Sequence, residues 1–100
     1  GTIDEGEEPH ETARRELIQE TGMKAEVFTP KGWIYPSPGY TDERIWLYIA
    51  ERLSPCYDYD MDEDEVIEVV RTPLRDLAAM IADGRIVDAK TICLICRCFL

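Results

Sequence analysis

The sequence predicts an α/β domain, α+β by its element order, because helical and strand-forming segments are separated along the chain. A helical segment opens the chain, β-prone segments fill its middle, and two apolar helical stripes close it. Helices that pack against the strands would give a layered domain. With 100 residues, of which 45% are hydrophobic, the chain is predicted to form one domain at most.

The first helix is predicted to span about Pro9 to Thr21. Proline suits the first turn of a helix, and several acidic residues stand near the positive end of the helix dipole. Gly22 follows where a helix commonly ends in a left-handed residue.

Two carboxylates, Glu16 and Glu20, are four residues apart on this helix. At 3.6 residues per turn they project from one face together with Gln19. Like charges at this spacing are mildly destabilising, so a cation between them would account for the pair. The alternative is an ordinary solvated helix surface.

Four segments in the middle of the chain are predicted to be strands, because they are rich in β-branched, aromatic or aliphatic residues. Pro30 and Gly32 mark a turn between the first two. The third segment has a nearly continuous apolar run, which predicts burial on both faces. The four segments are Lys24–Thr29, Trp33–Tyr35, Arg44–Leu53 and Val66–Thr72.

Two helices are predicted to close the chain. The first has Thr72 as its cap, Pro73 in its first turn and Gly84 at its end. The second is capped by Asp88 and carries an apolar stripe that includes Cys93 and Cys96. That stripe predicts buried, reduced core thiols rather than a zinc or redox pair.

An acidic segment, CYDYDMDEDE, lies between the third and fourth strands. A calcium loop of the EF-hand type is excluded, because the positions that require glycine and glutamate hold Glu63 and Val69. A solvated linker and a segment that supplies a catalytic carboxylate both stay open.

The overall charge limits the classes of ligand that the protein is expected to bind. Eleven basic and 21 acidic residues give a net charge of −10, which argues against a nucleic-acid backbone as ligand. There is no signal-peptide pattern and no apolar run long enough to span a membrane. We therefore expect a soluble, cytoplasmic protein.

The first 23 residues carry a longer pattern. Its fixed positions resemble the signature box of the Nudix hydrolases, G-x5-E-x7-R-E-U-x-E-E-x-G-U, in which U is a bulky aliphatic residue. Every fixed position matches except Gln19, where the family has a glutamate. The matching positions are Gly1, Glu7, Arg15, Glu16, Leu17, Glu20, Gly22 and Met23.

The resemblance implies a metal-dependent enzyme that cleaves a nucleoside diphosphate linked to another group. Glu16 and Glu20 would bind Mg²⁺, with Mn²⁺ as an alternative ion, while Glu7 and Arg15 would brace the box. Magnesium would reconcile a carboxylate-lined site with an anionic diphosphate. Gln19 brings no charge, so a metal held at that position would be weaker or absent.

Pro38 lies sixteen residues after Gly22, in the tract Ser37-Pro38-Gly39 followed by Glu43, and this arrangement resembles the ADP-ribose pyrophosphatase subfamily. The alternative is a rigid turn between strands. The resemblance makes Pro38 and Tyr40 candidate substrate-binding residues. It also implies a catalytic glutamate in the acidic segment, with Glu63 as first choice and Glu65 as second.

The fold implied by the resemblance is the Nudix α/β/α sandwich with a mixed sheet. Because that fold places strands before the box, residues 1–100 are expected to be the C-terminal portion of a Nudix hydrolase domain. The implied reaction is hydrolysis of ADP-ribose, or a related nucleoside diphosphate sugar, to AMP and a sugar phosphate by a homodimer. The alternatives are a Nudix hydrolase of another nucleotide and an inactive Nudix-fold nucleotide-binding module.

Overall fold

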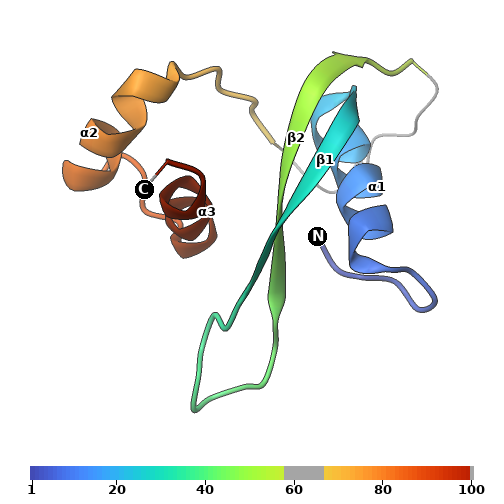
Figure 1. The fold of residues 1–100 in the computed structure, drawn as a ribbon, viewed down its shortest axis with the longest axis horizontal. Helices are drawn as coiled ribbons and strands as arrows, with labels where there is room; N and C mark the ends of the chain where they lie inside the picture. The colour runs from blue at the N-terminus through green and yellow to red at the C-terminus, as the bar shows by residue number, and fades with distance from the viewer. Residues whose placement is uncertain (58–66, 100) are drawn as a thin grey trace. The chain divides into compact units, whose positions relative to one another are not determined.

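The computed structural model describes residues 1–57 and 67–99. These residues form two compact units, Gly1–Pro30 with Tyr48–Val69 and Lys31–Leu47 with Val70–Leu100, and each is described by itself. The elements in chain order are α1 (Pro9–Thr21), β1 (Met23–Ile34), β2 (Ile45–Pro55), the 3₁₀ turn η1 (Leu74–Asp76), α2 (Leu77–Ala82) and α3 (Ala89–Phe99) (Figure 1).

Helix α1 has the predicted bounds, and both of its ends follow from local signals. At its start, a carboxylate oxygen of Glu11 accepts a hydrogen bond from the Glu8 N–H at 3.4 Å. At its end, Gly22 has a φ of 70° and donates its N–H to the Ile18 carbonyl at 2.8 Å. The left-handed glycine stops the helix where the sequence predicts.

Aromatic contacts hold α1 to the first unit's part of the sheet. The Arg14 guanidinium lies 4.5 Å from the centre of the Phe28 ring, which in turn meets Tyr48 edge-on. Cys56 donates its N–H to the Gly22 carbonyl at 2.8 Å, which ties the end of β2 to the turn after α1. These contacts fix which side of α1 faces the sheet.

Strands β1 and β2 pair as a two-stranded antiparallel sheet (Figure 1). The predicted turn at Pro30 and Gly32 is wrong, because β1 continues through both residues. Proline is tolerated where its missing N–H is not needed by a neighbouring strand, and a φ of 76° at Gly32 absorbs the irregularity. The prediction that β2 is buried on both faces is also wrong. In the described residues only Leu47 of this strand is buried. A sheet of two strands has little other structure packed on its faces, so most of its side chains stay in contact with solvent.

The predicted strand Val66–Thr72 is wrong over residues 67–72, where the backbone has no regular secondary structure. Val69 and Val70 are exposed there. A strand needs a neighbouring backbone to take up its N–H and C=O groups, and β propensity alone does not supply one. The α/β class is confirmed, but the described part holds an antiparallel pair instead of the expected mixed sheet.

The two C-terminal helical segments begin with different residues at their N-termini. Pro73, not Thr72 as predicted, precedes the first turn, which is 3₁₀ before it continues as α2. Asp88 caps α3 as predicted, since its Oδ2 accepts from both the N–H and the Oγ1 of Thr91 at 2.9 Å. The cysteines of α3 are free thiols as predicted, but the prediction that they are buried is wrong, because in the described residues they are only half-buried. No helix in the described residues has the length and apolarity needed to cross a membrane.

Candidate active site

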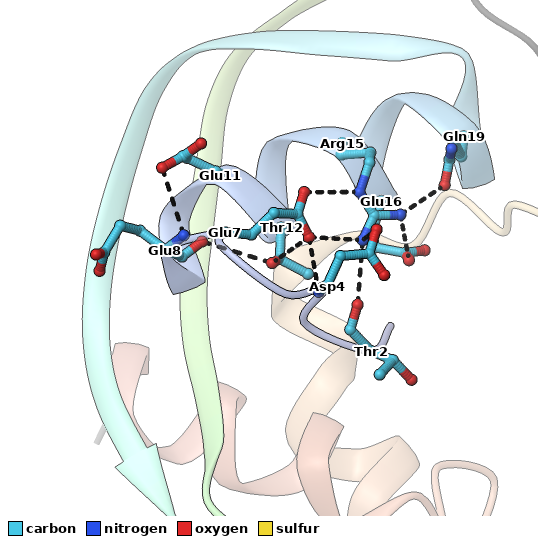
Figure 2. Close-up of polar contacts among 9 residues, drawn as sticks. All are labelled: Thr2, Asp4, Glu7, Glu8, Glu11, Thr12, Arg15, Glu16 and Gln19. Atoms are coloured by element: carbon cyan, nitrogen blue, oxygen red, sulfur yellow. Dashed lines mark hydrogen bonds and ion pairs between the residues drawn. The ribbon is translucent and has the colours of Figure 1, made fainter.

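The centre of the candidate site is the Arg15 guanidinium on α1 (Figure 2). Its Nε and Nη2 donate to the two carboxylate oxygens of Glu7 at 2.9 and 3.0 Å. Nη2 also donates to the Thr2 carbonyl at 3.1 Å. Nη1 donates to Oε1 of Glu16 at 3.0 Å and to Oε1 of Gln19 at 3.2 Å. A guanidinium has five N–H donors, so all five have an acceptor.

Glu7 reaches this centre from the loop before α1. Besides Arg15, it accepts from the Asp4 N–H at 2.9 Å and from the Thr12 hydroxyl at 3.0 Å. The hydrogen bonds from Arg15 are the largest cause that lowers the pKa of Glu7 from 4.5 to about 2. The same contact raises the pKa of Arg15 above its ordinary value. The Glu7–Arg15 pair that the resemblance assigns to bracing the box is thus a direct two-bonded contact.

Glu16 is held between Arg15 and the first residue of the chain. Its side chain is 18% exposed, and Oε1 is fixed by the guanidinium. A Cβ added to Gly1 would collide with the Glu16 carboxylate. A glycine at this position therefore leaves the space that the carboxylate fills.

Glu20 lies one turn further along α1 and is half-buried. Carboxylate oxygens at i and i+4 suit Mg²⁺, which usually takes one or two carboxylates and completes its shell with waters and phosphate oxygens. The described residues contain no group of three or more acidic, histidine or cysteine side chains arranged for a metal. The donor set of Glu16 and Glu20 fits a magnesium ion that keeps several non-protein ligands.

The other predicted site residues are placed differently. Glu63 and Glu65 lie outside the described residues, so their role stays a prediction. Pro38 and Tyr40 belong to the second unit, where Ser37 accepts N–H hydrogen bonds from Tyr40 and Thr41, both at 3.1 Å. Tyr40 is 94% exposed at this turn. The structure thus shows the turn between strands, and substrate binding there stays a prediction.

Sequence reasoning missed three partners of the site. Thr12 is the one buried polar residue among the described ones, at 5% exposure, and it supports Glu7. Its place one turn before Glu16 on the same helix was the available signal. Asp4 lies 3.3 Å from Arg15, and the Thr2 carbonyl completes the arginine's acceptors. Neither contact has a signal in the sequence, because both depend on how the loop folds back.

Comparison with known proteins shows the family of the chain. The family model of the Nudix domain matches residues 1–95. The chain belongs to the Nudix domain family.

Among curated relatives of this Nudix chain, the ADP-ribose pyrophosphatase of Bacillus subtilis (strain 168) is 40% identical over 92 residues, which are 91% of the chain and 50% of the relative. The methanol dehydrogenase activator of Bacillus methanolicus is 38% identical over 93 residues, with 92% and 50% covered. The GDP-mannose pyrophosphatase of Yersinia pestis (strain Pestoides F) is 39% identical over 102 residues, with 95% and 48% covered. The chain spans about half the length of these relatives.

Proposed function

We propose that the protein is a Mg²⁺-dependent pyrophosphatase that hydrolyses the diphosphate bond of ADP-ribose, or of a related nucleoside diphosphate sugar, to AMP and a sugar phosphate. The observation that carries this proposal is the carboxylate of Glu16, fixed by Arg15 and followed one helical turn later by Glu20. The Nudix family and the names of the pyrophosphatase relatives support it.

The residues of the site divide the work. Glu16 and Glu20 would hold the metal, which would supply positive charge for the phosphates and a lowered pKa for a bound water. Arg15 has no donor left for a phosphate oxygen, so its task is to hold Glu7 and Glu16 in place. Fixed charges aimed at the bridging phosphates would then supply most of the rate enhancement.

The remaining site residues are proposed on the resemblance. Glu63, or else Glu65, activates the attacking water, and Pro38 and Tyr40 contact the substrate. A general base must come within hydrogen-bond reach of the water it deprotonates, so single Gln variants of the two glutamates distinguish them. We further propose that residues 1–100 form the C-terminal portion of the Nudix hydrolase domain and that the enzyme acts as a homodimer.

Turnover of ADP-ribose by the full-length protein with Mg²⁺, followed by release of phosphate from the products by a phosphatase, tests the proposal. We expect activity that EDTA abolishes and that Glu20→Gln reduces by at least about a hundredfold, as loss of a metal ligand does. His10→Gln is the matched control, since His10 is exposed on the same helix. Wild-type protein that fails to cleave ADP-ribose would contradict the proposed substrate.

A second candidate is hydrolysis of another nucleotide sugar, which the GDP-mannose pyrophosphatase relatives favour. Parallel measurement of kcat/KM for ADP-ribose and GDP-mannose decides between the two. An inactive nucleotide-binding module would bind both compounds and cleave neither. Gln19 is the one box position that favours such a module.

A further inference from the structure

Position 19 is where this chain departs from the Nudix box, and the structure shows what the side chain there contacts. The carbonyl oxygen of Gln19 accepts from Nη1 of Arg15 at 3.2 Å. The other proton of Nη1 is directed to Oε1 of Glu16 at 3.0 Å. Figure 2 shows Gln19 and Glu16 both bonded to the same nitrogen.

This contact completes the set of hydrogen-bond acceptors around the Arg15 guanidinium. The other three donors are used by Glu7 and the Thr2 carbonyl, so Gln19 supplies the fifth and last acceptor. Arg15 is only 30% exposed, so a donor without an acceptor would not be fully compensated by water. An acceptor at position 19 is therefore useful to Arg15 whether or not it carries a charge.

The charge of that acceptor is a separate matter. Arg15 already lies within ion-pair distance of Asp4, Glu7 and Glu16. A carboxylate at position 19 would be a further anion on one cation, whereas an amide oxygen fills the same hydrogen-bond position and remains neutral.

We propose that Gln19 is a positioning residue whose carbonyl is the neutral fifth acceptor of Arg15, and that this contact holds Nη1 of Arg15 against Glu16. The proposal goes beyond the loss of a ligand expected from the sequence. A glutamate placed at position 19 would offer Arg15 an acceptor at the same place. Its consequence for metal binding rests on the proposed function, but the contact with Arg15 does not.

The contact is tested first, without metal, by NMR of full-length protein labelled with ¹⁵N-arginine. Rotation about the Cζ–Nη1 bond of Arg15 exchanges the proton facing Glu16 with the proton facing Gln19. Gln19→Met removes the acceptor and keeps the length of the side chain, so we expect this exchange to become about twofold faster, the effect of losing one hydrogen bond at a partly exposed site. Gln19→Glu should restore slow exchange, and His10→Met, on the exposed side of the helix, should leave it unchanged. Equal exchange rates in wild type and Gln19→Met overturn the proposal.

The metal is tested by titration of the same variants with Mn²⁺, followed by calorimetry. We expect Gln19→Met to bind Mn²⁺ about threefold more weakly than wild type, because Glu16 is less firmly held. Equal affinity for Mn²⁺ in wild type and Gln19→Met overturns the proposal that Gln19 holds Glu16 in place through Arg15. If wild type binds no Mn²⁺, the proposed metal site fails, and the NMR exchange rate alone decides the role of Gln19.

Discussion

Replacing Arg15 with lysine would keep the positive charge and remove the planar fork that holds the site together. A lysine has one nitrogen, which reaches one carboxylate, so four of the five hydrogen bonds of Arg15 are lost or pass to water. Because the arginine is 30% exposed, each bond is placed at the low end of the usual range, about 0.5 kcal/mol. The expected loss in free energy of unfolding is therefore about 2 kcal/mol.

Urea unfolding of full-length wild type and Arg15→Lys measures this loss, with an unchanged m value as the sign that only stability has changed. Arg85→Lys is the matched control. Arg85 pairs with Asp83 on the surface, with its side chain 59% exposed, and such pairs contribute at most about 1 kcal/mol. A loss for Arg15→Lys no larger than that for Arg85→Lys would refute the view that the five-bonded guanidinium organises the box.

Three further changes probe the box. Gly22→Ala should lower the free energy of unfolding by about 1 kcal/mol, because its φ of 70° is strained for a residue with a Cβ, and Gly22→Asn should lower it less; urea unfolding decides. The folded pKa of Glu7, about 2 against 4.5, means that its stabilising contact is complete above pH 4.5 and is lost as the pH falls toward 2. Glu7→Gln should therefore be less stable than wild type at pH 7, and the difference measured by urea unfolding should shrink below pH 4; a constant difference would contradict the pKa. Gly1→Ala should weaken Mn²⁺ binding about tenfold in calorimetry, because the added Cβ displaces the Glu16 carboxylate.

The elements that could be predicted from the sequence are those whose signals are local. Helix α1 has its predicted bounds because Pro9 favours the first turn of the helix and Gly22 ends the last one, each through its own backbone conformation. Asp88 caps α3 for the same reason, since the N–H and hydroxyl of Thr91 that donate to its carboxylate lie three residues away. Such interactions do not depend on the rest of the molecule.

The strands could not be predicted as well, because a strand is defined by its neighbour. Residues 67–72 have the composition of a strand but no regular structure, while Pro30 and Gly32 have the composition of a turn and lie within β1. In both cases the backbone pairing decided the outcome, and pairing is a property of segments distant in sequence.

The site shows the same division between spacing and contact. The four-residue spacing of Glu16 and Glu20 follows from helix geometry and was predicted from the sequence. The contact between Glu7 and Arg15 was implied by the family pattern and depends on a loop that folds back onto the helix. The hydrogen bond from Arg15 to Gln19 depends on two side-chain rotamers, which the sequence does not specify.

The charges around Arg15 connect this contact to the need for a metal. One guanidinium faces the carboxylates of Asp4, Glu7 and Glu16, and Glu20 lies one turn beyond Glu16. The arginine uses its donors to hold these groups in place, but a single positive charge cannot neutralise them, and the chain as a whole carries −10. A neutral Gln19 keeps the fifth acceptor without adding to the imbalance. The proposed Mg²⁺ would add positive charge on the helix face that carries Glu16 and Glu20.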